Sequence, residues 1–268
     1  MNKEASKALV DGDVLLYRCG FAADSQMLGQ LRQEVQAEHP EWDETAVKEN
    51  AKLRLDYEDY EHYATGNLNS VIDSILEGRS EYILYLTGPG NFREQVATIL
   101  PYKGNRDPSH KPKYYKELKQ YMFSKHNAVE VQGMEADDAL AMEQWKNRDK
   151  STIICTIDKD LDMVPGWHYN INSKETYWVD LDSANYFFFW QMLVGDSTDN
   201  IPGIKGKGKK RATDLLLHLK GDTHAMMDVV GNLYREQYGD NYVSAYNEVA
   251  TLLWMKREED KDCDFLIS

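Results

Sequence analysis

The stretch TIICTIDKDL, residues 152–161, decides the fold. Thr152–Ile157 is an unbroken apolar and β-branched run with polar residues on either side, a pattern that predicts a buried strand. Asp158 and Asp160 follow the run directly. The stretch therefore predicts a buried strand that ends in two carboxylates.

Similar short runs occur on both sides of this one. We predict strands over Ala8–Cys19, Tyr82–Leu86 and Ala128–Val131, and helices over Glu135–Arg148 and Ala212–Leu219. Strands separated by helices predict an α/β fold with a mostly parallel central sheet flanked by helices. From about Leu181 the patterns are helical and no clear strand follows. A chain of 268 residues suits about two domains, so we predict an α/β domain over 1–180 and a helical region over 181–268.

The composition is that of a globular protein, with 42% hydrophobic and 28% charged residues. No apolar run approaches the roughly 20 residues of a membrane span, and the first residues lack the apolar stretch of a signal peptide. The three cysteines, Cys19, Cys155 and Cys263, form no Cys-x-x-Cys pair, and we interpret them as reduced packing residues. We therefore expect a cytoplasmic protein without a membrane partner.

Charge is strongly segregated along the chain. The formal net charge of −14 argues, taken alone, against a nucleic-acid partner. Residues 34–62 hold ten acids and three bases, and we interpret them as a helical, solvent-facing insertion. Residues 101–126 and 203–220 each carry a net charge of +5. Two basic segments thus stand in an acidic protein.

Acids gather in four short motifs. They are Asp11-Gly12-Asp13, Glu135-Ala136-Asp137-Asp138, Asp158-Lys159-Asp160 and Asp196-Ser197-Thr198-Asp199. The carboxyl ends of parallel strands share one edge of the sheet, where ligands bind, so distant motifs can meet there. Helix capping explains any single motif equally well. All four together would repel one another in one crevice unless cations offset the charge.

The chemistry of these acids points to particular ions. Hard oxygen ligands without His or Cys indicate Mg²⁺ or Mn²⁺. A pair of such ions is the usual device for phosphodiester cleavage, one activating water and the other stabilising the leaving oxygen. No zinc-protease, Cys/His zinc or Gly-x-Ser-x-Gly motif supports another hydrolytic chemistry.

The two basic segments differ in character. The first interleaves bases with aromatic residues, which suits a single nucleic-acid strand, although a solvated helix face is the simpler explanation. The second, Gly203-Ile204-Lys205-Gly206-Lys207-Gly208-Lys209-Lys210, places glycines and lysines before a helix, which suits a grip on a phosphate backbone. It is not a P-loop, because Lys210 stands where Ser or Thr should bind Mg²⁺.

Five motifs stand in a recognisable order. They are Val10-Asp11-Gly12, Tyr102-Lys103-Gly104-Asn105-Arg106, Gly133-Met134-Glu135-Ala136-Asp137-Asp138, Thr156-Ile157-Asp158-Lys159-Asp160-Leu161 and Gly195-Asp196-Ser197-Thr198-Asp199-Asn200-Ile201-Pro202-Gly203. Across roughly residues 8–220 the chain resembles the flap endonuclease/5′→3′ exonuclease superfamily, in particular bacteriophage exonucleases and the 5′-nuclease domain of bacterial DNA polymerase I. The resemblance implies a PIN-like nuclease domain with an arch at about 103–131, followed by a helix-three-turn-helix (helix-hairpin-helix) region.

The resemblance also implies roles for individual residues. Catalytic cations that contact the scissile phosphate correspond to Lys103, Arg106 and Arg18. The first metal corresponds to Asp11, Glu135, Asp137 and Asp138, and the second to Asp158, Asp160, Asp196 and Asp199. DNA contacts are expected from Tyr102, Lys111, Lys113, Lys116 and Lys119 in the arch and from Gly203, Lys205, Gly206, Lys207, Gly208, Lys209 and Lys210 in the hairpin. The implied ions are two Mg²⁺, replaceable by Mn²⁺, with K⁺ at the hairpin.

Two positions depart from the family pattern. Relatives usually carry a further metal-binding Asp after the second strand, upstream of a Phe-Arg pair, whereas Leu86–Arg93 contains no acid. Either Asp13 compensates or the first ion binds more weakly. In the hairpin, Lys207 replaces the usual apolar residue between the glycines, which favours phosphate attraction over tight packing.

The expected activity is a divalent-metal-dependent 5′→3′ exonuclease and flap endonuclease. The substrate would be duplex DNA with a 5′ end, a 5′ flap or an RNA/DNA hybrid, cleaved in replication or repair to leave 5′-phosphate products. We expect a monomer in the cytoplasm of a bacterium or a phage-infected cell. One alternative is a haloacid-dehalogenase-type phosphatase. The motifs of that family are imitated here by Asp11-x-Asp13, Thr87 and Gly195-Asp196, but Leu15 stands where the family has a Thr. The other is a non-catalytic DNA-binding protein with a PIN-like fold.

Overall fold

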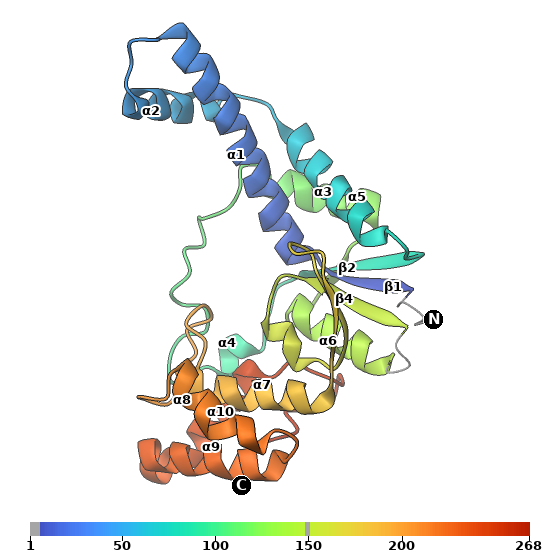
Figure 1. Cartoon of the computed structure of the whole chain (residues 1–268), viewed down its shortest axis with the longest axis vertical. Coiled ribbons are helices and arrows are strands. Elements are labelled where there is room, and N and C mark those ends of the chain that lie inside the picture. The colour runs from blue at the N-terminus through green and yellow to red at the C-terminus, as the bar shows by residue number, and fades with distance from the viewer. Residues whose placement is uncertain (1–5, 148–150) are drawn as a thin grey trace.

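The computed structural model describes residues 6–147 and 151–268. At its centre lies a sheet with the strand order β3-β2-β1-β4-β5-β6 (Figure 1). The strands are β1 (Lys7–Asp11), β2 (Glu81–Thr87), β3 (Val129–Val131), β4 (Thr152–Thr156), β5 (Gly166–Asn170) and β6 (Thr176–Val179). All neighbours pair in parallel except β5 and β6, which are antiparallel. The mostly parallel α/β sheet expected from the sequence is confirmed.

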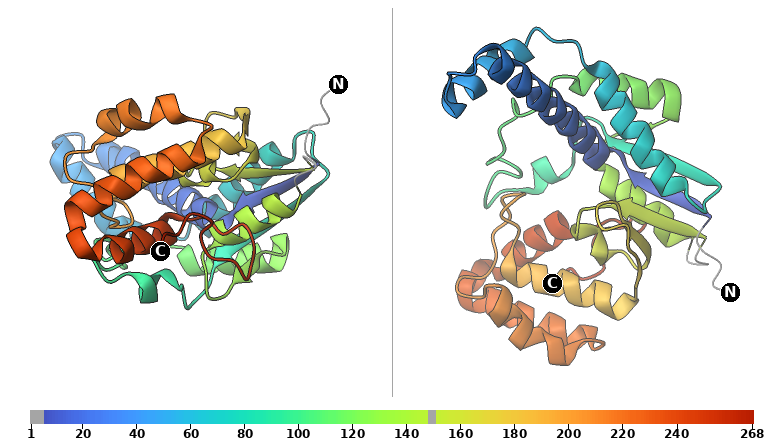
Figure 2. Two further views of the ribbon diagram at one scale, coloured as in Figure 1. Left: turned by 90° about the horizontal axis from the view of Figure 1, so that it is seen from below. Right: turned by 45° about the horizontal axis from the view of Figure 1, so that its top comes forward.

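Helices cover both faces of this sheet. They are α1 (Gly12–Glu38), α2 (Glu44–Leu55), α3 (Glu61–Leu76), α4 (Arg93–Val96), α5 (Tyr115–His126), α6 (Ala136–Lys146), α7 (Leu181–Val194), α8 (Lys209–Leu216), α9 (Thr223–Tyr238) and α10 (Tyr242–Leu253), with 3₁₀ turns at Asp160–Met163, Leu217–Leu219 and Gly239–Asn241. Helices α1, α3 and α5 lie on one side, and α6 with the C-terminal helices α7–α10 lies on the other (Figures 1 and 2). None of the described helices is long and apolar enough to cross a membrane.

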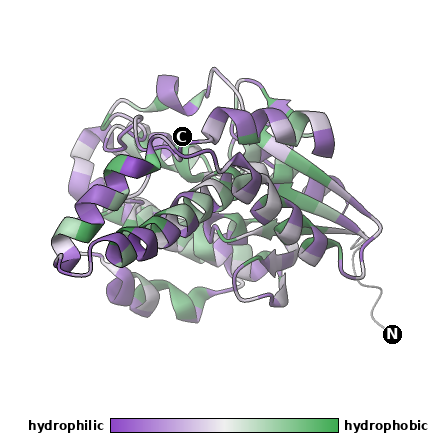
Figure 3. Ribbon diagram, turned by 90° about the horizontal axis from the view of Figure 1, so that it is seen from above, coloured by the Kyte–Doolittle hydropathy of each residue, from purple (hydrophilic) through white to green (hydrophobic). Residues whose placement is uncertain are grey.

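Two hydrophobic clusters, one on each face of the sheet, explain this arrangement. Successive strand residues point to opposite faces, so Ala8 and Val10 of β1 join the cluster under α1, α3 and α5, whereas Leu9 joins the cluster under α6. The second cluster continues through α7, α8, α9 and α10. The C-terminal helices therefore pack onto the same sheet. In Figure 3 the hydrophobic colour gathers in the strands, while hydrophilic residues are frequent on the surrounding helices.

Helix α1 is 27 residues long and projects beyond the sheet (Figure 1). Its outer half packs against α2 through a small buried cluster of Leu31, Val35, Val47 and Ala51. The acidic stretch 34–62 is thus mainly helical, as expected, but it is not wholly solvent-facing, because it contributes part of this cluster.

Element ends differ from the sequence predictions. The strand predicted over Ala8–Cys19 ends at Asp11, and α1 begins at Gly12. Asp11 stops the strand by capping the helix, its Oδ1 accepting a hydrogen bond from the Val14 N–H at 3.0 Å. A Cβ at Gly12 would lie 2.5 Å from the Tyr85 carbonyl oxygen, so the close turn requires glycine. The predicted end of a helix at Arg148 lies outside the described residues.

Candidate active site

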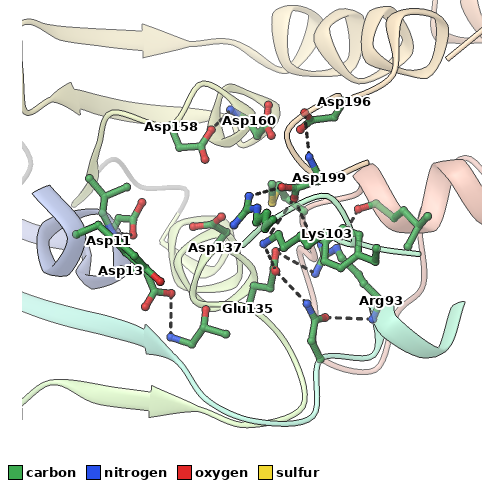
Figure 4. Close-up of a pocket in the computed structure, with 18 of the residues that line it drawn as sticks. Asp11, Asp13, Arg93, Lys103, Glu135, Asp137, Asp158, Asp160, Asp196 and Asp199 are labelled. Carbon is green, nitrogen blue, oxygen red and sulfur yellow. Dashed lines mark hydrogen bonds and ion pairs between the residues drawn. The ribbon is translucent and has the colours of Figure 1, made fainter. Parts of the chain in front are cut away.

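A cavity of about 780 Å³ lies at the carboxyl edge of the sheet (Figure 4). Acids of all four sequence motifs line it: Asp11, Asp13, Glu135, Asp137, Asp158, Asp160, Asp196 and Asp199. Glu94, an exposed acid that the sequence did not single out, also lines it. The cavity's basic residues are Arg18, Arg93, Lys103 and Arg106. The structure therefore brings together acids and bases that lie far apart in the chain.

The ends of three adjacent strands fix Asp11, Asp13 and Asp158. Asp11 ends β1, and its Oδ2 accepts a hydrogen bond from the Thr156 hydroxyl at 2.8 Å. Thr156 ends β4 and accepts the Asp158 N–H at 2.9 Å. On the other side of β1, the N–H of Thr87, which ends β2, donates to Asp13 Oδ2 at 3.0 Å. These carboxylates are thus held by backbone and hydroxyl groups of neighbouring strands.

Glu135 is held at the N-terminus of α6. It forms a reciprocal capping box with Asp138. Its carboxylate accepts hydrogen bonds from Asn91 Nδ2 at 2.9 Å and from the Tyr102 hydroxyl at 3.0 Å, and it is paired with the Lys103 ammonium. Glu135 therefore links the α6 terminus to the basic segment that follows α4.

The basic segment is bound to the turn that carries Asp199. The Lys103 N–H donates to the Asp199 carbonyl at 2.9 Å, and Asn200 Nδ2 donates to the Pro101 carbonyl at 2.8 Å. Lys103 Nζ lies 3.6 Å from Asp199 Oδ2, and Arg106 is paired with Oδ1 of the same carboxylate. Lys103 and Arg106, two of the three predicted catalytic cations, thus contact predicted metal-binding acids.

Burial and crowding raise the pKa of five carboxyl groups in this cavity. Burial is the largest cause for each, and neighbouring carboxylates add to it for the whole set: Asp11, Asp13, Asp137, Asp158 and Asp160. The pKa of Asp11 rises to about 7 and that of Asp160 to about 8. The ionised form of each carboxyl is therefore disfavoured in this cavity, and either protonation or a nearby cation would stabilise the group.

The donor set fits a hard divalent cation in its chemistry and charge. Every candidate ligand is a carboxylate oxygen, the type that Mg²⁺ and Mn²⁺ prefer. Within residues 6–147 and 151–268, no three acidic, His or Cys side chains already surround one point at coordinating distance. Lys103 and Arg106 instead neutralise Glu135 and Asp199. Binding of ions would therefore exchange these ion pairs for metal contacts.

Asp138 is placed differently from the expectation that it holds the first metal. It does not line the cavity and is fully buried. Its two oxygens accept hydrogen bonds from Arg93 Nη1 at 2.5 Å and Nη2 at 2.9 Å, and the Lys256 N–H donates to Oδ1 at 3.1 Å. These partners occupy the carboxylate, so the structure gives Asp138 a positioning role beneath the site.

Several residues expected to contact DNA in the arch are engaged within the protein. The Tyr102 hydroxyl bonds Glu135 and, at 2.8 Å, Asp199. Lys113 Nζ donates to the carbonyls of Leu55, Asp56 and Glu58 at the end of α2. Lys119 pairs with Glu130 at 2.9 Å. By contrast, Lys111 and Lys116 are exposed, with the Lys111 ammonium 4.6 Å from the centroid of the Tyr115 ring.

The predicted arch is also partly packed. Within 103–131, helix α5 buries Leu118 and Met122 in the cluster shared with α1 and α3. Pro112 touches α1 so closely that a Cβ at Gly20 would lie 2.5 Å from its ring. The continuously exposed part of the segment is therefore 104–111, which joins Lys103 to Pro112.

The hairpin lysines form a separate exposed surface. Lys205, Lys209 and Lys210 are exposed and Lys207 is half-buried. Gly206 has a φ of +76°, a left-handed conformation that favours glycine. Gly208 precedes α8, whose first residues are Lys209 and Lys210. Glycine and lysine thus surround a helix N-terminus, as the sequence indicated.

Sequence comparison relates parts of the chain to much longer proteins. No protein-family model matches the chain. The chain is 27% identical to DNA polymerase I of Pseudomonas aeruginosa over 198 residues, which are 63% of this chain and 21% of that protein. It is 36% identical to the thermostable DNA polymerase I of Thermus caldophilus over 108 residues, 33% of this chain and 12% of that protein. The chain thus matches about a fifth or less of the length of these relatives.

Structure comparison covers nearly the whole chain. A bacteriophage T5 flap endonuclease, solved in complex with DNA and metal ions, matches with a TM-score of 0.54 and 14% identity over 92% of this chain and 98% of that one. The chain has the fold of the phage flap endonuclease. A T5 protein co-crystallised with metal ions matches similarly, with a TM-score of 0.52 and 17% identity over 92% and 95%. The flap-endonuclease fold and the similarity to DNA polymerase I agree with the resemblance in the motifs.

Proposed function

We propose that the chain is a divalent-metal-dependent 5′→3′ exonuclease and flap endonuclease, which hydrolyses DNA phosphodiesters at or near a 5′ end and leaves 5′-phosphate products. One observation carries the proposal: eight motif acids share a cavity with Lys103, Arg106 and Arg18 on a flap-endonuclease fold. The relatives' name, DNA polymerase I, supports a role in DNA replication or repair.

The acids divide into two groups by their place in the fold. Four acids from the end of β1 and the starts of α1 and α6 would hold the first ion: Asp11, Asp13, Glu135 and Asp137. Asp158, Asp160, Asp196 and Asp199, from the loops after β4 and α7, would hold the second. Asp13 takes the place of the acid that is absent from Leu86–Arg93. When bound, such ions lower the pKa of a water nucleophile and offset charge on the phosphate.

The cations of the chain itself would orient the phosphate and offset its growing charge. Lys103 stays protonated. Burial lowers the pKa of its ammonium, but the neighbouring carboxylates of Glu135 and Asp199 together raise it by more, so the net shift of the pKa is upward. Arg18 lines the cavity, and its Nη1 is buried with no hydrogen-bond partner among the described residues. A phosphate oxygen would satisfy this donor. The bond between phosphorus and the 3′ oxygen breaks, so the phosphate stays on the 5′ end.

Binding would depend on the phosphate backbone rather than on base sequence. The exposed lysines of the hairpin and Lys111 and Lys116 supply positive charge outside the acidic cavity. The same proposal includes Mg²⁺ as the natural ion, Mn²⁺ as its substitute and K⁺ at the hairpin. It also includes a monomeric state and a location in the cytoplasm of a bacterium or a phage-infected cell.

A panel of substrates tests the proposal. The purified chain is incubated with 5′-labelled flap DNA, blunt duplex DNA, an RNA/DNA hybrid and a small phosphate ester, each with Mg²⁺ or with chelator. We expect Mg²⁺-dependent shortening from the 5′ end and no phosphate release from the ester. Release from the ester alone would support the phosphatase, and DNA retention without cleavage in Mg²⁺ would support a binding protein.

A further inference from the structure

Thr156 lies where two acids of the cavity meet. It is the last residue of β4, which runs parallel to β1 with Val10 opposite Cys155. Its side chain is buried, with 4% exposure. The hydroxyl accepts the Asp158 N–H at 2.9 Å and donates its single proton to Asp11 Oδ2 at 2.8 Å. One side chain thus joins an acid of the first group to an acid of the second.

These bonds hold the Asp11 carboxylate at both oxygens, and they hold Asp158 at its backbone N–H and at one carboxylate oxygen. The remaining oxygen of Asp11 accepts the Val14 N–H at 3.0 Å, so both oxygens are held in a fixed plane by α1 and β4. Asp158 Oδ1 accepts the Asp160 N–H at 2.9 Å, and Asp160 Oδ1 accepts a hydrogen bond from Gln191 of α7 at 2.6 Å. A continuous series of hydrogen bonds therefore runs from β1 through Thr156 to α7.

We propose that Thr156 is a positioning residue that sets the orientation and spacing of Asp11 and Asp158, and thereby the affinity of the two-ion site. This inference rests on the proposed function. Groups that hydrogen-bond to metal ligands fix the orientation of those ligands, and their removal typically weakens metal affinity or activity by about 10- to 100-fold. A threonine in a buried strand also has a purely packing explanation, since β-branched residues favour strands.

The same strand provides a matched control for the packing explanation. Thr152 begins β4, is buried with 3% exposure, and donates its hydroxyl proton to Gln144 Oε1 at 2.8 Å. Its partner Gln144 is not among the residues that line the cavity, whereas Asp11, the partner of Thr156, is. Thr152→Val and Thr156→Val therefore remove the same group from the same strand, and each leaves one buried acceptor unpaired. Thr156→Val also leaves the Asp158 N–H without its acceptor. Only Thr156→Val removes hydrogen bonds to Asp11 and Asp158.

The test measures binding of Mg²⁺ and of Mn²⁺, without DNA, by titration calorimetry of the whole chain. We expect Thr156→Val to weaken affinity by about 10- to 100-fold, while Thr156→Ser, which keeps the hydroxyl, and Thr152→Val stay near the wild type. Both valine variants should lose thermal stability, and Thr156→Val at least as much as Thr152→Val, because its hydroxyl makes two hydrogen bonds rather than one. Equal ion affinity in Thr156→Val and Thr152→Val would overturn the inference.

Two further arms keep the result decisive. If Thr156→Val does not fold by circular dichroism, Thr156→Cys replaces it, because a thiol is only a weak donor. Its affinity should then lie below that of Thr156→Ser, and equality would overturn the inference. A wild-type chain that binds neither ion would instead contradict the proposed function itself, so the two failures are distinguishable.

Discussion

The guanidinium of Arg93 and the carboxylate of Asp138 form a two-point ion pair beneath the cavity, with separations of 2.5 and 2.9 Å. Neither side chain is accessible, with 1% and 0% exposure. Arg93 also donates to the carbonyls of Leu252 at 2.9 Å and Trp254 at 2.6 Å, at the end of α10. The pair thus ties the α6 terminus, which carries Glu135, to the C-terminal helix.

Loss of either partner should destabilise the protein strongly. Arg93→Ala or Asp138→Ala leaves a buried charge without its partner, which costs about 3–5 kcal/mol. The measurement is the free energy of unfolding in urea. Lys119→Ala is the control, because the Lys119–Glu130 pair at 2.9 Å is partly exposed and should contribute less than about 1 kcal/mol. A similarly small loss in Arg93→Ala would contradict this interpretation.

Lys103 should matter for cleavage more than for DNA binding. Its ammonium lies between Glu135 and Asp199, where it can offset charge that develops on the phosphate. Lys103→Ala should lower the single-turnover cleavage rate of flap DNA by about 100- to 1,000-fold, with little change in DNA affinity. Lys125→Ala, an exposed lysine at the end of α5, serves as the control. Equal rates in the two variants would exclude a catalytic role for Lys103.

The raised pKa values predict a pH dependence of the effect of Mg²⁺ on stability. Asp11 and Asp160 have pKa values of about 7 and about 8, against an ordinary value of 3.8, so the folded protein binds their protons more tightly than the unfolded chain does. Without divalent ions, their contribution to the free energy of unfolding therefore falls as pH rises from about 4 to about 8.

Added Mg²⁺ should reverse this loss, because metal competes with protons for the same oxygens. We expect Mg²⁺ to raise Tm more at about pH 8 than at about pH 5.5, measured by thermal scans with chelator as reference. In the double variant Asp11→Asn/Asp160→Asn, the Mg²⁺-induced rise in Tm should differ less between the two pH values than it does in the wild type. Equal stabilisation of the wild type at both pH values would refute the assignment.

The hairpin should account for much of the salt dependence of DNA binding. Each phosphate contact contributes about 0.9 to the slope of log affinity against log salt on duplex DNA. Replacing Lys205, Lys207, Lys209 and Lys210 with alanine should flatten this slope, measured by fluorescence anisotropy at several salt concentrations. Lys48→Ala/Lys52→Ala, on α2 within the acidic stretch 34–62, is the control. An unchanged slope in the hairpin variant would remove the hairpin from the DNA interface.

The sequence predicted the elements whose chemistry is local. The apolar run before Asp158 could only be buried as a strand, and all five residues of β4 are buried. The acidic motifs lie at strand and helix ends because carboxylates cap helices, as Asp11 does for α1. The sequence alone therefore predicted that these motifs meet at one edge of the sheet.

Long-range partners could not be predicted in the same way. Nothing near Asp138 in the sequence indicates that Arg93, 45 residues away, occupies both its oxygens. Likewise, the bonds of Lys113 to the end of α2 depend on how α1 and α2 project together. The strands β5 and β6 were missed because their mixed polar and aromatic residues show no clear period.

Single-turnover cleavage of 5′-labelled flap DNA by Asp158→Ala/Asp160→Ala tests the central claim most directly. The wild type and the control Asp228→Ala, an exposed acid on α9, should both cut the flap in Mg²⁺. The double variant should still bind the DNA but should cut no faster than the wild type does in chelator, because the second group of carboxylates is broken. Cleavage by the double variant at the wild-type rate would contradict the account.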